Sequence, residues 1–263
     1  MPELAELKLT ADYINSCSDG IKYVGISQTT NHKGSKIDIP YLFFKMSAVS
    51  RGKELIIKIN DNDSKNSISI RMTMGMSGHF RLSNSTHEPK HSHIKFHRKD
   101  GTTLSFVDVR RFGKWKITDD WSSNRGPDPT LEFDEFKSNI MSNLHKKEFD
   151  KQIHLVLMNQ RYFNGIGNYL RAEILYSINA DPFTKARDYI ESHGDRLFEL
   201  CKQIPELAYV MGGGSIKDWI NPFKSELEYP RTKSDFFKCY NQPDMYQTVD
   251  KNGRRFWYNP KWQ

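Results

Sequence analysis

The pattern of hydrophobic and polar positions first indicates a helix at the N-terminus. Hydrophobic residues recur there at intervals of three and four, the spacing of a buried helical stripe: Leu4, Leu7, Ala11 and Ile14. The acidic residues Glu3 and Glu6 fall outside this stripe. The sequence therefore predicts a packed helix that anchors the start of the chain.

The next hundred residues have the pattern of β-strands. Short apolar or alternating runs are separated there by polar clusters, and their spacing suits a sandwich or barrel. The predicted strands cover residues 21–28, 41–50, 54–59, 67–74, 93–97, 103–109 and 113–117.

The second half of the chain is predicted to be helical and to end in a hairpin. Residues 122–130 have the composition of a linker, and helical periodicity follows at 131–144, 149–158, 168–177, 186–193 and 195–211. Near the C-terminus, Asn252-Gly253 lies between apolar and aromatic runs, which predicts a β-hairpin. We therefore expect an α+β protein with a β-rich domain at 1–121, a linker at 122–130, a helical domain at 131–235 and a hairpin at 236–263.

Composition narrows the class of partner. The chain has 263 residues, with 39 Lys and Arg against 32 Asp and Glu, a formal charge of +7 and a pI near 9.1. This charge favours an anionic partner, with nucleic acid as the first candidate and an acidic membrane surface as the second. No apolar run approaches the ~18 residues of a membrane span, and the first helix carries acids where a signal peptide would be basic. We expect a soluble intracellular protein that is not secreted.

The cysteines suggest neither a disulfide framework nor a zinc site. Cys17, Cys201 and Cys239 are scattered along the chain, odd in number, and form no Cys-x-x-Cys pair. We therefore expect reduced, mostly structural thiols and no metal.

Met1-Pro2-Glu3 offers a nucleophile. Removal of Met1 would leave Pro2 with a free imino nitrogen beside the Glu3 carboxylate. An α-amino group titrates near pH ~8 against ~10.4 for lysine, so a larger fraction of it can attack a carbonyl carbon at neutral pH. Because proline nitrogen is secondary, its product with an aldehyde is a cationic iminium that promotes β-elimination. The alternative is that Pro2 only begins the helix, a position that proline favours.

Four further segments carry candidate chemistry, each with a structural alternative. Lys53 follows a glycine at a strand entrance, where it could hold a phosphate or be an ordinary turn lysine. Met76 lies in the loop Gly75-Met76-Ser77-Gly78 and could be a wedge that enters a base stack or a core side chain.

Of the other two segments, Asp108-Val109-Arg110-Arg111-Phe112-Gly113 could fill the space of an extruded base and bind phosphate, although Arg-Arg-Phe alone is a weak motif. Asn164-Gly165-Ile166-Gly167-Asn168 is a glycine-rich turn that opens a helix. Free backbone N–H groups there, with the Asn168 side chain, suit phosphate, but structural caps look similar.

The order of these motifs resembles the formamidopyrimidine-DNA glycosylase/endonuclease VIII family across nearly the whole chain. The order is Pro-Glu, Arg-Gly-Lys, Gly-Met-Ser-Gly, Lys90-His91-Ser92-His93, Asp-Val-Arg-Arg-Phe-Gly, Gly-Pro-Asp-Pro and Asn-Gly-Ile-Gly-Asn-Tyr. Within the family, the cysteine-free terminal hairpin resembles the eukaryotic zincless-finger type. The resemblance implies a β-sandwich domain, a helix-two-turn-helix domain and a zincless finger.

The resemblance also implies base-excision repair by a bifunctional DNA glycosylase with abasic-site lyase activity. By this resemblance, the enzyme is expected to flip out oxidised pyrimidines, formamidopyrimidines or hydantoins and to cleave the strand by β,δ-elimination. It implies duplex DNA with oxidised bases or abasic sites as the partner, with bubble or single-stranded DNA as further substrates. It also implies a monomer without cofactor, located in the nucleus or wherever the genome is replicated.

Residue roles follow from the same resemblance. Pro2 matches the Schiff-base nucleophile, Glu3 the general acid/base, and Lys53 a phosphate and proton-transfer residue. The void-filling triad is matched by Met76, Arg110 and Phe112. The phosphate-binding asparagine and the finger arginine are matched by Asn168 and Arg254. Positions that are structural or contact phosphate are matched by Glu6, Arg111 and His91.

Two departures from the family limit these implications. The lesion-reading loop falls near residues 210–217, where Gly214 and Ile216 replace the expected basic and aromatic residues. The chain ends at Gln263, soon after the hairpin, so docking by a long tail is not expected.

Two other functions stay open at this point. A non-catalytic duplex-binding protein follows if Met1 is retained. A zinc enzyme would need ligands from His87, His91, His93 and His97, but no cysteine or carboxylate motif supports it, so phosphate contacts or plain surface positions are favoured for these histidines.

Overall fold

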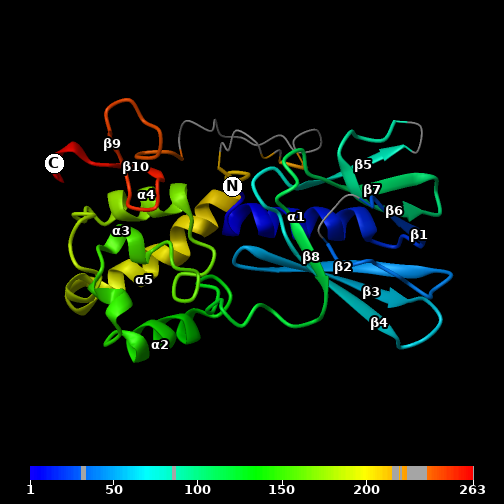
Figure 1. Ribbon diagram of the computed structural model, residues 1–263, viewed down its shortest axis with the longest axis horizontal. Helices are drawn as coiled ribbons and strands as arrows, with labels where there is room; N and C mark the ends of the chain where they lie inside the picture. The colour runs from blue at the N-terminus through cyan, green and yellow to red at the C-terminus, as the bar shows by residue number, and fades with distance from the viewer. Residues whose placement is uncertain (31–33, 85–86, 215–218, 220, 224–235, 263) are drawn as a thin grey trace. The chain divides into compact units, whose positions relative to one another are not determined.

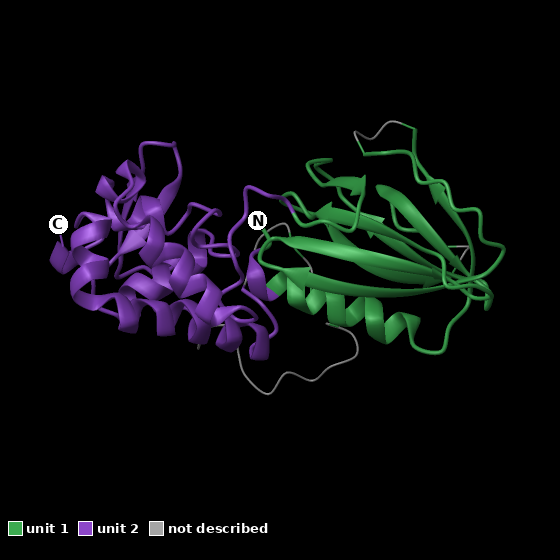
Figure 2. Cartoon of the chain, turned by 90° about the horizontal axis from the view of Figure 1, so that it is seen from below, with its two compact units in different colours: residues 1–2, 6–121, 215–228 green, residues 3–5, 122–214, 229–263 purple. Residues whose placement is uncertain are grey.

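The computed structural model describes residues 1–263 except 31–33, 85–86, 215–218, 220, 224–235 and 263. These described residues form two compact units, coloured separately in Figure 2. Unit 1 contains Met1–Pro2, Glu6–Trp121 and the described part of 215–228. Unit 2 contains Glu3–Ala5, Ser122–Gly214 and the described part of 229–263. The start of the chain thus contributes to both units.

Unit 1 combines the N-terminal helix with a sheet of eight strands in the order β5-β7-β6-β1-β2-β3-β4-β8 (Figure 1). The elements are α1 (Leu4–Ser18), β1 (Tyr23–Gln28), β2 (Phe44–Arg51), β3 (Glu54–Asp61), β4 (Ser67–Thr73), β5 (His79–Asn84), β6 (Ser92–Arg98), β7 (Thr102–Val107) and β8 (Lys114–Ile117).

The sheet is a β-sandwich of two four-stranded halves. Only one residue pair, Tyr23 with Phe44, joins β1 to β2, whereas β2 and β3 pair along eight positions. The rings of Tyr23 and Phe44 stack at 5.5 Å where the halves meet. Buried side chains from both halves form one hydrophobic core, to which α1 contributes Leu7, Ala11, Tyr13 and Ile14. The predicted sandwich and N-terminal helix are therefore confirmed.

The helix α1 is buried on more sides than its sequence pattern indicates. Glu6 and Thr10 have no exposed surface, although they lie outside the apolar stripe. The Thr10 hydroxyl donates to the Glu6 carbonyl at 2.7 Å, and the Asn15 side chain exchanges two hydrogen bonds with the Ala48 backbone of β2. Polar residues are tolerated inside because such bonds replace those to water.

Unit 2 is helical and ends in a two-stranded hairpin (Figure 1). Its elements are α2 (Phe133–Asn143), the 3₁₀ turn η1 (Lys147–Asp150), α3 (Ile153–Val156), α4 (Asn168–Ser177), α5 (Ala186–Val210), β9 (Tyr246–Val249), β10 (Arg255–Tyr258) and η3 (Pro260–Trp262). Within the described part of the chain, no helix is long and apolar enough to cross a membrane.

Two predictions were wrong in detail, and a third agrees with the structure. No strand was predicted at 79–84, but β5 pairs with β7 along its whole length. The predicted helix 149–158 is interrupted at Lys151 and Gln152, whose extended backbone forms a bridge between Gln152 and Lys185. The predicted break between helices 186–193 and 195–211 is confirmed, because α5 consists of two helices that meet at a kink at His193, whose backbone is not helical. In the first two cases a partner distant in sequence overrides the local pattern.

Candidate functional site

The N-terminal segment places a buried carboxylate on the end of a helix. Glu3 is 3% exposed, and its side chain accepts hydrogen bonds from the backbone N–H groups of Tyr169 and Leu170 at 3.1 and 3.4 Å. These are the first free N–H groups of α4, where the helix dipole favours a negative charge. The Leu4 N–H donates to the Gly165 carbonyl at 3.2 Å, which fixes the same segment.

This contact corrects one expectation. The N–H groups that open α4 were expected to be free for phosphate, but those of Tyr169 and Leu170 are bound by Glu3. Helix α4 therefore positions a carboxylate.

Pro2 and Lys53 are both partly or fully shielded from solvent. Pro2 is buried, whereas Met1 is 55% exposed. Since Met1 acylates the Pro2 nitrogen in the numbered chain, that nitrogen becomes nucleophilic only after Met1 is removed. Lys53 is half-buried in the turn between β2 and β3, where Gly52 has a φ of 55°.

The loops that carry Met76 and the Arg-Arg-Phe motif are held together by Asp108. Asp108 is fully buried; its carboxylate accepts from the Ser77 hydroxyl at 2.5 Å and from the Gly113 N–H at 2.7 Å. The Ser77 hydroxyl oxygen accepts from the Arg110 N–H at 3.1 Å. A Cβ atom at Gly75 would lie 2.5 Å from the Gly113 nitrogen, so the two loops touch through backbone.

The predicted void-filling side chains project from this pair of loops. Phe112 is 52% exposed, and the Arg110 guanidinium lies 5.0 Å from the centre of its ring. Met76 is half-buried. Arg111 is exposed and has a φ of 53°, a conformation that is uncommon for residues other than glycine. The structure therefore brings Met76, Arg110 and Phe112 together, as a shared role requires.

The histidines of unit 1 support these loops. His93 contacts the Thr29 hydroxyl through Nδ1 at 3.2 Å and the Asp108 carbonyl through Nε2 at 2.9 Å. The exposed His91 has a φ of 64°, and its carbonyl accepts from the Asp108 N–H at 3.1 Å. His97 contacts Ser27 at 2.8 Å. Among the described residues, no group of three His, Cys, Asp or Glu could hold a metal ion.

In unit 2, the buried Arg171 connects the start of α4 to the hairpin. Its guanidinium donates to the His154 carbonyl at 3.1 Å, to the Asp250 carboxylate at 3.2 Å and to the Asn168 side-chain oxygen. The Asn168 amide nitrogen donates to the Arg255 carbonyl at 2.8 Å. Asn168 is thus oriented with its N–H₂ group toward the hairpin.

Asp250 fixes the hairpin turn that carries Arg254. Its carboxylate accepts from the Asn252 and Arg254 N–H groups at 2.8 and 3.0 Å. Burial opposes ionisation, but these bonds and the Arg171 guanidinium hold the pKa of Asp250 below its ordinary value. The exposed Arg254 side chain is therefore presented on a rigid turn.

The hairpin packs through aromatic rings. Phe256 stacks on His154 at 4.4 Å, and Trp257 lies 4.6 Å from Tyr240. Burial and the neighbouring Arg171 charge lower the pKa of His154 to about 3, so this ring is neutral. Glu173 accepts three backbone N–H groups of 238–240, at 2.7 to 3.1 Å, which secure the chain before β9.

Sequence reasoning gave no role to Arg171, Glu173 or Asp250. A signal was present, because Arg171 and Glu173 interrupt the run Tyr169–Leu175, in which every residue is buried. Charges inside such a run need partners.

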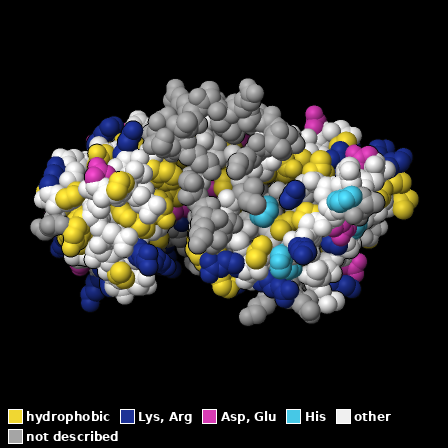
Figure 3. Space-filling model, turned by 90° about the horizontal axis from the view of Figure 1, so that it is seen from above, with side chains coloured by type: hydrophobic (Ala, Val, Ile, Leu, Met, Phe, Trp, Pro, Cys, Tyr) yellow, Lys and Arg dark blue, Asp and Glu magenta, His cyan; other side chains and the backbone are white. Residues whose placement is uncertain are grey.

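Two predicted sites have a different outcome. In the predicted lesion-reading loop, Gly212 and Gly213 have φ of 80° and 89°, but residues 215–217 lie outside the described residues. Glu6 is fully buried in α1, which fits the structural one of its two predicted roles. In the view of Figure 3, Lys and Arg side chains are distributed over both units.

Comparison with known proteins supports the resemblance at the level of sequence. Residues 1–115 match the profile of the formamidopyrimidine-DNA glycosylase N-terminal domain, and residues 125–219 match that of its H2TH domain. Endonuclease 8-like 1 of Mus musculus is 32% identical over 286 aligned residues, which cover 98% of this chain and 72% of the relative. The Homo sapiens protein of the same name is 30% identical with the same coverage.

Solved structures share the fold. The crystal structure of MutM (Fpg) from Thermus thermophilus has a TM-score of 0.81 at 22% identity, covering 100% of this chain and 98% of that one. A Lactococcus lactis Fpg variant in complex with Fapy-dG-containing DNA has a TM-score of 0.78 at 21% identity, covering 100% and 99%. With two matching domains and near-complete alignment to relatives, this chain belongs to the formamidopyrimidine-DNA glycosylase/endonuclease VIII family.

Proposed function

We propose that this protein is a bifunctional DNA glycosylase and abasic-site lyase of base-excision repair, with Pro2 as its nucleophile. The proposal rests on the N-terminus of this family member. Glu3 directly follows Pro2, and its carboxylate accepts hydrogen bonds from two backbone N–H groups. This docking fixes the backbone beside the nucleophile. The family membership and the Lactococcus lactis Fpg complex with damaged DNA support the class of substrate.

The chemistry follows from the secondary amine. The Pro2 nitrogen attacks C1′ of the damaged nucleoside, the glycosidic bond breaks, and the base leaves with a proton. The C1′–O4′ bond then breaks, which gives the Pro2 iminium and a 4′ hydroxyl that takes up a proton. The iminium draws electrons from C2′, so loss of a C2′ proton expels the 3′ phosphate by β-elimination. A second elimination expels the 5′ phosphate. Glu3 transfers protons during ring opening and excision, and Lys53 binds phosphate and assists proton transfer.

The other candidate residues hold the DNA. Met76, Arg110 and Phe112 fill the space that the extruded base leaves, and offset the cost of unstacking of a few kcal/mol. Asn168 and Arg254 bind backbone phosphates, with Arg111 and His91 as further contacts.

The substrates are oxidised pyrimidines, formamidopyrimidines and hydantoins in duplex DNA, with bubble and single-stranded DNA as further substrates. The protein works as a monomer without cofactor, in the nucleus or wherever the genome is replicated.

Borohydride trapping on abasic-site DNA tests this function. Chain that has lost Met1 should form a covalent adduct, and an N-terminal extension that acylates the Pro2 nitrogen should abolish it while duplex affinity changes little, because the nucleophile makes few ground-state contacts. A full yield of adduct from N-terminally blocked protein would assign the lyase to another amine.

Glu3→Gln separates the two activities. It should abolish excision of an oxidised pyrimidine yet retain some nicking of preformed abasic sites. The amide oxygen of the substituted side chain can still accept the N–H groups of Tyr169 and Leu170, so loss of excision reports on proton transfer. Normal excision by this variant would remove Glu3 from the mechanism.

If Met1 is retained, a second candidate applies, a non-catalytic lesion- or duplex-binding protein on the same scaffold. Mass spectrometry of the N-terminus of the protein isolated from its natural source distinguishes the two. An intact Met1 together with duplex affinity supports this second function.

A further inference from the structure

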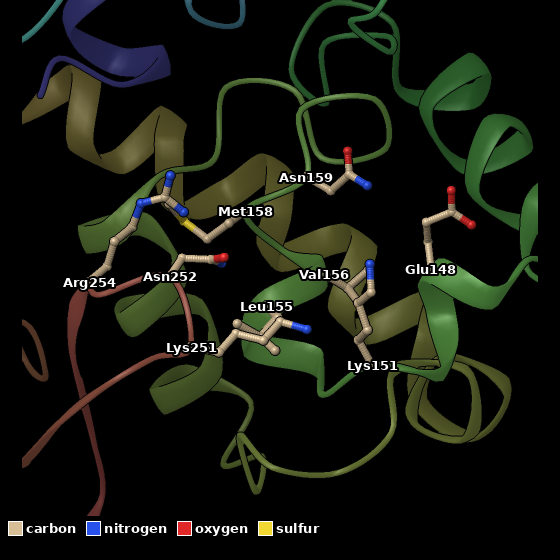
Figure 4. A pocket seen from close by; sticks show the side chains of 9 residues that line it. All are labelled: Glu148, Lys151, Leu155, Val156, Met158, Asn159, Lys251, Asn252 and Arg254. Atoms are coloured by element: carbon tan, nitrogen blue, oxygen red, sulfur yellow. The ribbon is translucent and has the colours of Figure 1, made fainter.

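A pocket of about 230 Å³ lies in unit 2 between the hairpin turn and the η1–α3 segment (Figure 4). One wall carries Lys251, Asn252 and Arg254, and the other carries Glu148, Lys151 and Asn159. Three apolar side chains of residues 155–158 complete the lining. The volume corresponds to about eight water molecules at ~30 Å³ each, which is enough for one phosphate group with bridging water.

The pocket has an excess of positive charge. Three cations, Lys151, Lys251 and Arg254, face one carboxylate, Glu148. Among the described residues, none of the three cations forms an ion pair. The charge of Arg254 also acts on Arg171. Burial lowers the pKa of Arg171, and the positive charge of Arg254 lowers it further. An excess of cations around one pocket favours a bound anion.

Both walls of the pocket are rigid before any ligand binds. The hairpin turn is fixed by Asp250, which binds the N–H groups of Asn252 and Arg254, and by the Gly253 N–H, which donates to the Asp250 carbonyl at 2.9 Å. The Lys151 carbonyl on the other wall accepts from the Ala186 N–H at 2.9 Å. A preorganised site loses less entropy when it binds its ligand.

The helix end nearby does not compete for the anion. Glu3 accepts from the N–H groups of Tyr169 and Leu170, so these two donors of α4 are not available to a phosphate. Asn168 contacts the backbone of Arg255, the residue that follows Arg254. Arg254 therefore connects the predicted phosphate contact at Asn168 to the pocket.

We propose that this pocket binds one backbone phosphate of duplex DNA, in addition to the phosphate assigned to Asn168. Lys151 and Lys251 contact the phosphate from opposite walls, and Arg254 lies between the two phosphates. Only the identity of the ligand as DNA rests on the proposed function. The site contributes affinity for duplex DNA without reading its sequence.

Salt dependence of binding to an undamaged duplex tests the site without any catalysis. Neutralising one phosphate contributes a slope of about 0.9 in log K against log salt. Lys151→Ala and Lys251→Ala should each lower the slope, and the double variant should lower it by about 1, with affinity about tenfold weaker near 0.1 M salt. The control is Lys147→Ala, an exposed lysine of η1 that does not line the pocket, and it should bind like the parent.

Glu148→Gln gives the opposite sign. Removing the one carboxylate of the pocket should strengthen duplex binding by roughly twofold, whereas a purely structural role for Glu148 would weaken it or leave it unchanged. Urea midpoints equal to that of the parent show that the lysine variants are folded, as expected for two exposed side chains.

The outcomes separate this proposal from the proposed function. An unchanged slope in the double variant overturns the site, and a fall near 2 shows two independent phosphates in place of one shared phosphate. If inorganic phosphate binds to the pocket while the DNA slope stays unchanged, the site serves a free anion and the DNA ligand is wrong. Failure of borohydride trapping with the expected slope change would remove the lyase and leave the phosphate site.

Discussion

Each unit uses a buried charge to hold two chain segments together, and the two charges have opposite signs. In unit 1, the Asp108 carboxylate joins the Met76 loop to the Arg-Arg-Phe loop through a hydroxyl and a backbone N–H. In unit 2, the Arg171 guanidinium joins the start of α4 to the hairpin, and one of its partners is the charged Asp250. Each unit thereby fixes the segments that carry its proposed DNA contacts.

The difference lies in what remains when the central charge is removed. The donors around Asp108 are neutral and lie close to exposed loop residues, so water or an amide can replace part of the carboxylate. Asp250 is itself a charge, and neither it nor Arg171 has exposed side-chain surface. Removal of the central charge should therefore lower the free energy of unfolding more in unit 2, at Arg171, than in unit 1, at Asp108.

Arg171→Met should have the largest effect. It leaves Asp250 buried without its counter-charge and should lower the free energy of unfolding by about 3–5 kcal/mol, the usual cost of breaking a buried pair from one side. Urea unfolding measures the loss. The double variant Arg171→Met/Asp250→Asn removes both charges and should recover more than half of it. Equal stability of the single and double variants would show that the pair does not hold the hairpin.

The same comparison predicts independence from zinc. The hairpin is held by Arg171, Asp250 and stacked rings such as Phe256 on His154. Chelators should therefore leave stability and activity unchanged. Stoichiometric zinc in elemental analysis, lost together with activity, would contradict this account.

How much of this could be read from sequence depends on the range of the interaction. The bounds of α4 were predicted at Asn168 and Ser177, as found, because a glycine-rich turn and an apolar run are local signals. The strand β5 was missed because its partner, β7, begins 23 residues after it starts, at Thr102 against His79. The sandwich itself follows from repeated short strands, so it was predictable without exact pairing.

The candidate site divides in the same way. The proposed void-filling residues were predicted from motifs, but nothing local shows that Ser77 contacts Asp108, 31 positions along the chain. Likewise, Glu3 reaches the Tyr169 N–H across 166 positions and occupies the helix end that sequence assigned to phosphate. Motifs predicted the candidate side chains, whereas the groups that orient them come from long-range packing.

Asp108→Asn should have the next largest effect. The amide keeps an acceptor for the Gly113 N–H, but its N–H₂ group must now donate to Ser77, whose hydroxyl loses its carboxylate acceptor. We expect a loss of about 2 kcal/mol in stability, measured by urea unfolding. Ser77→Ala is the milder control, since it removes the hydroxyl and keeps the bond to Gly113. A larger loss of stability for Ser77→Ala than for Asp108→Asn would show that Ser77, and not Asp108, is the main residue that joins the two loops.

Truncating the void-filling triad should change activity rather than stability. With Met76, Arg110 and Phe112 all replaced by Ala, excision from duplex DNA should fall at least tenfold more than excision from single strands, where no stack needs replacing. The measurement is the duplex-to-single-strand activity ratio. A ratio equal to that of the parent would leave these residues without a void-filling role.

The smallest expected effect appears only in mild acid and concerns His154, beneath the hairpin. Its folded pKa is about 3, against 6.5 for an ordinary histidine, because burial and the Arg171 charge disfavour the cation. As pH falls below 6.5, the unfolded chain takes up a proton that the folded chain refuses, so stability is full above pH 6.5 and falls toward pH 3.

This contribution should make the parent about 1.4 kcal/mol less stable at pH 5.5 than at pH 7.5. His154→Gln, which cannot titrate, should lack this loss. Asp250 does not interfere, since the pKa of its carboxylate lies below the ordinary 3.8 and outside this window. His79 in unit 1 provides the comparison, because burial also lowers the pKa of this histidine. His79→Gln should reduce the loss of stability of unit 1 in mild acid and leave the acid sensitivity of the hairpin unchanged. If His154→Gln keeps the full acid sensitivity of the parent, the neutral histidine beneath Phe256 is not what couples the hairpin to pH.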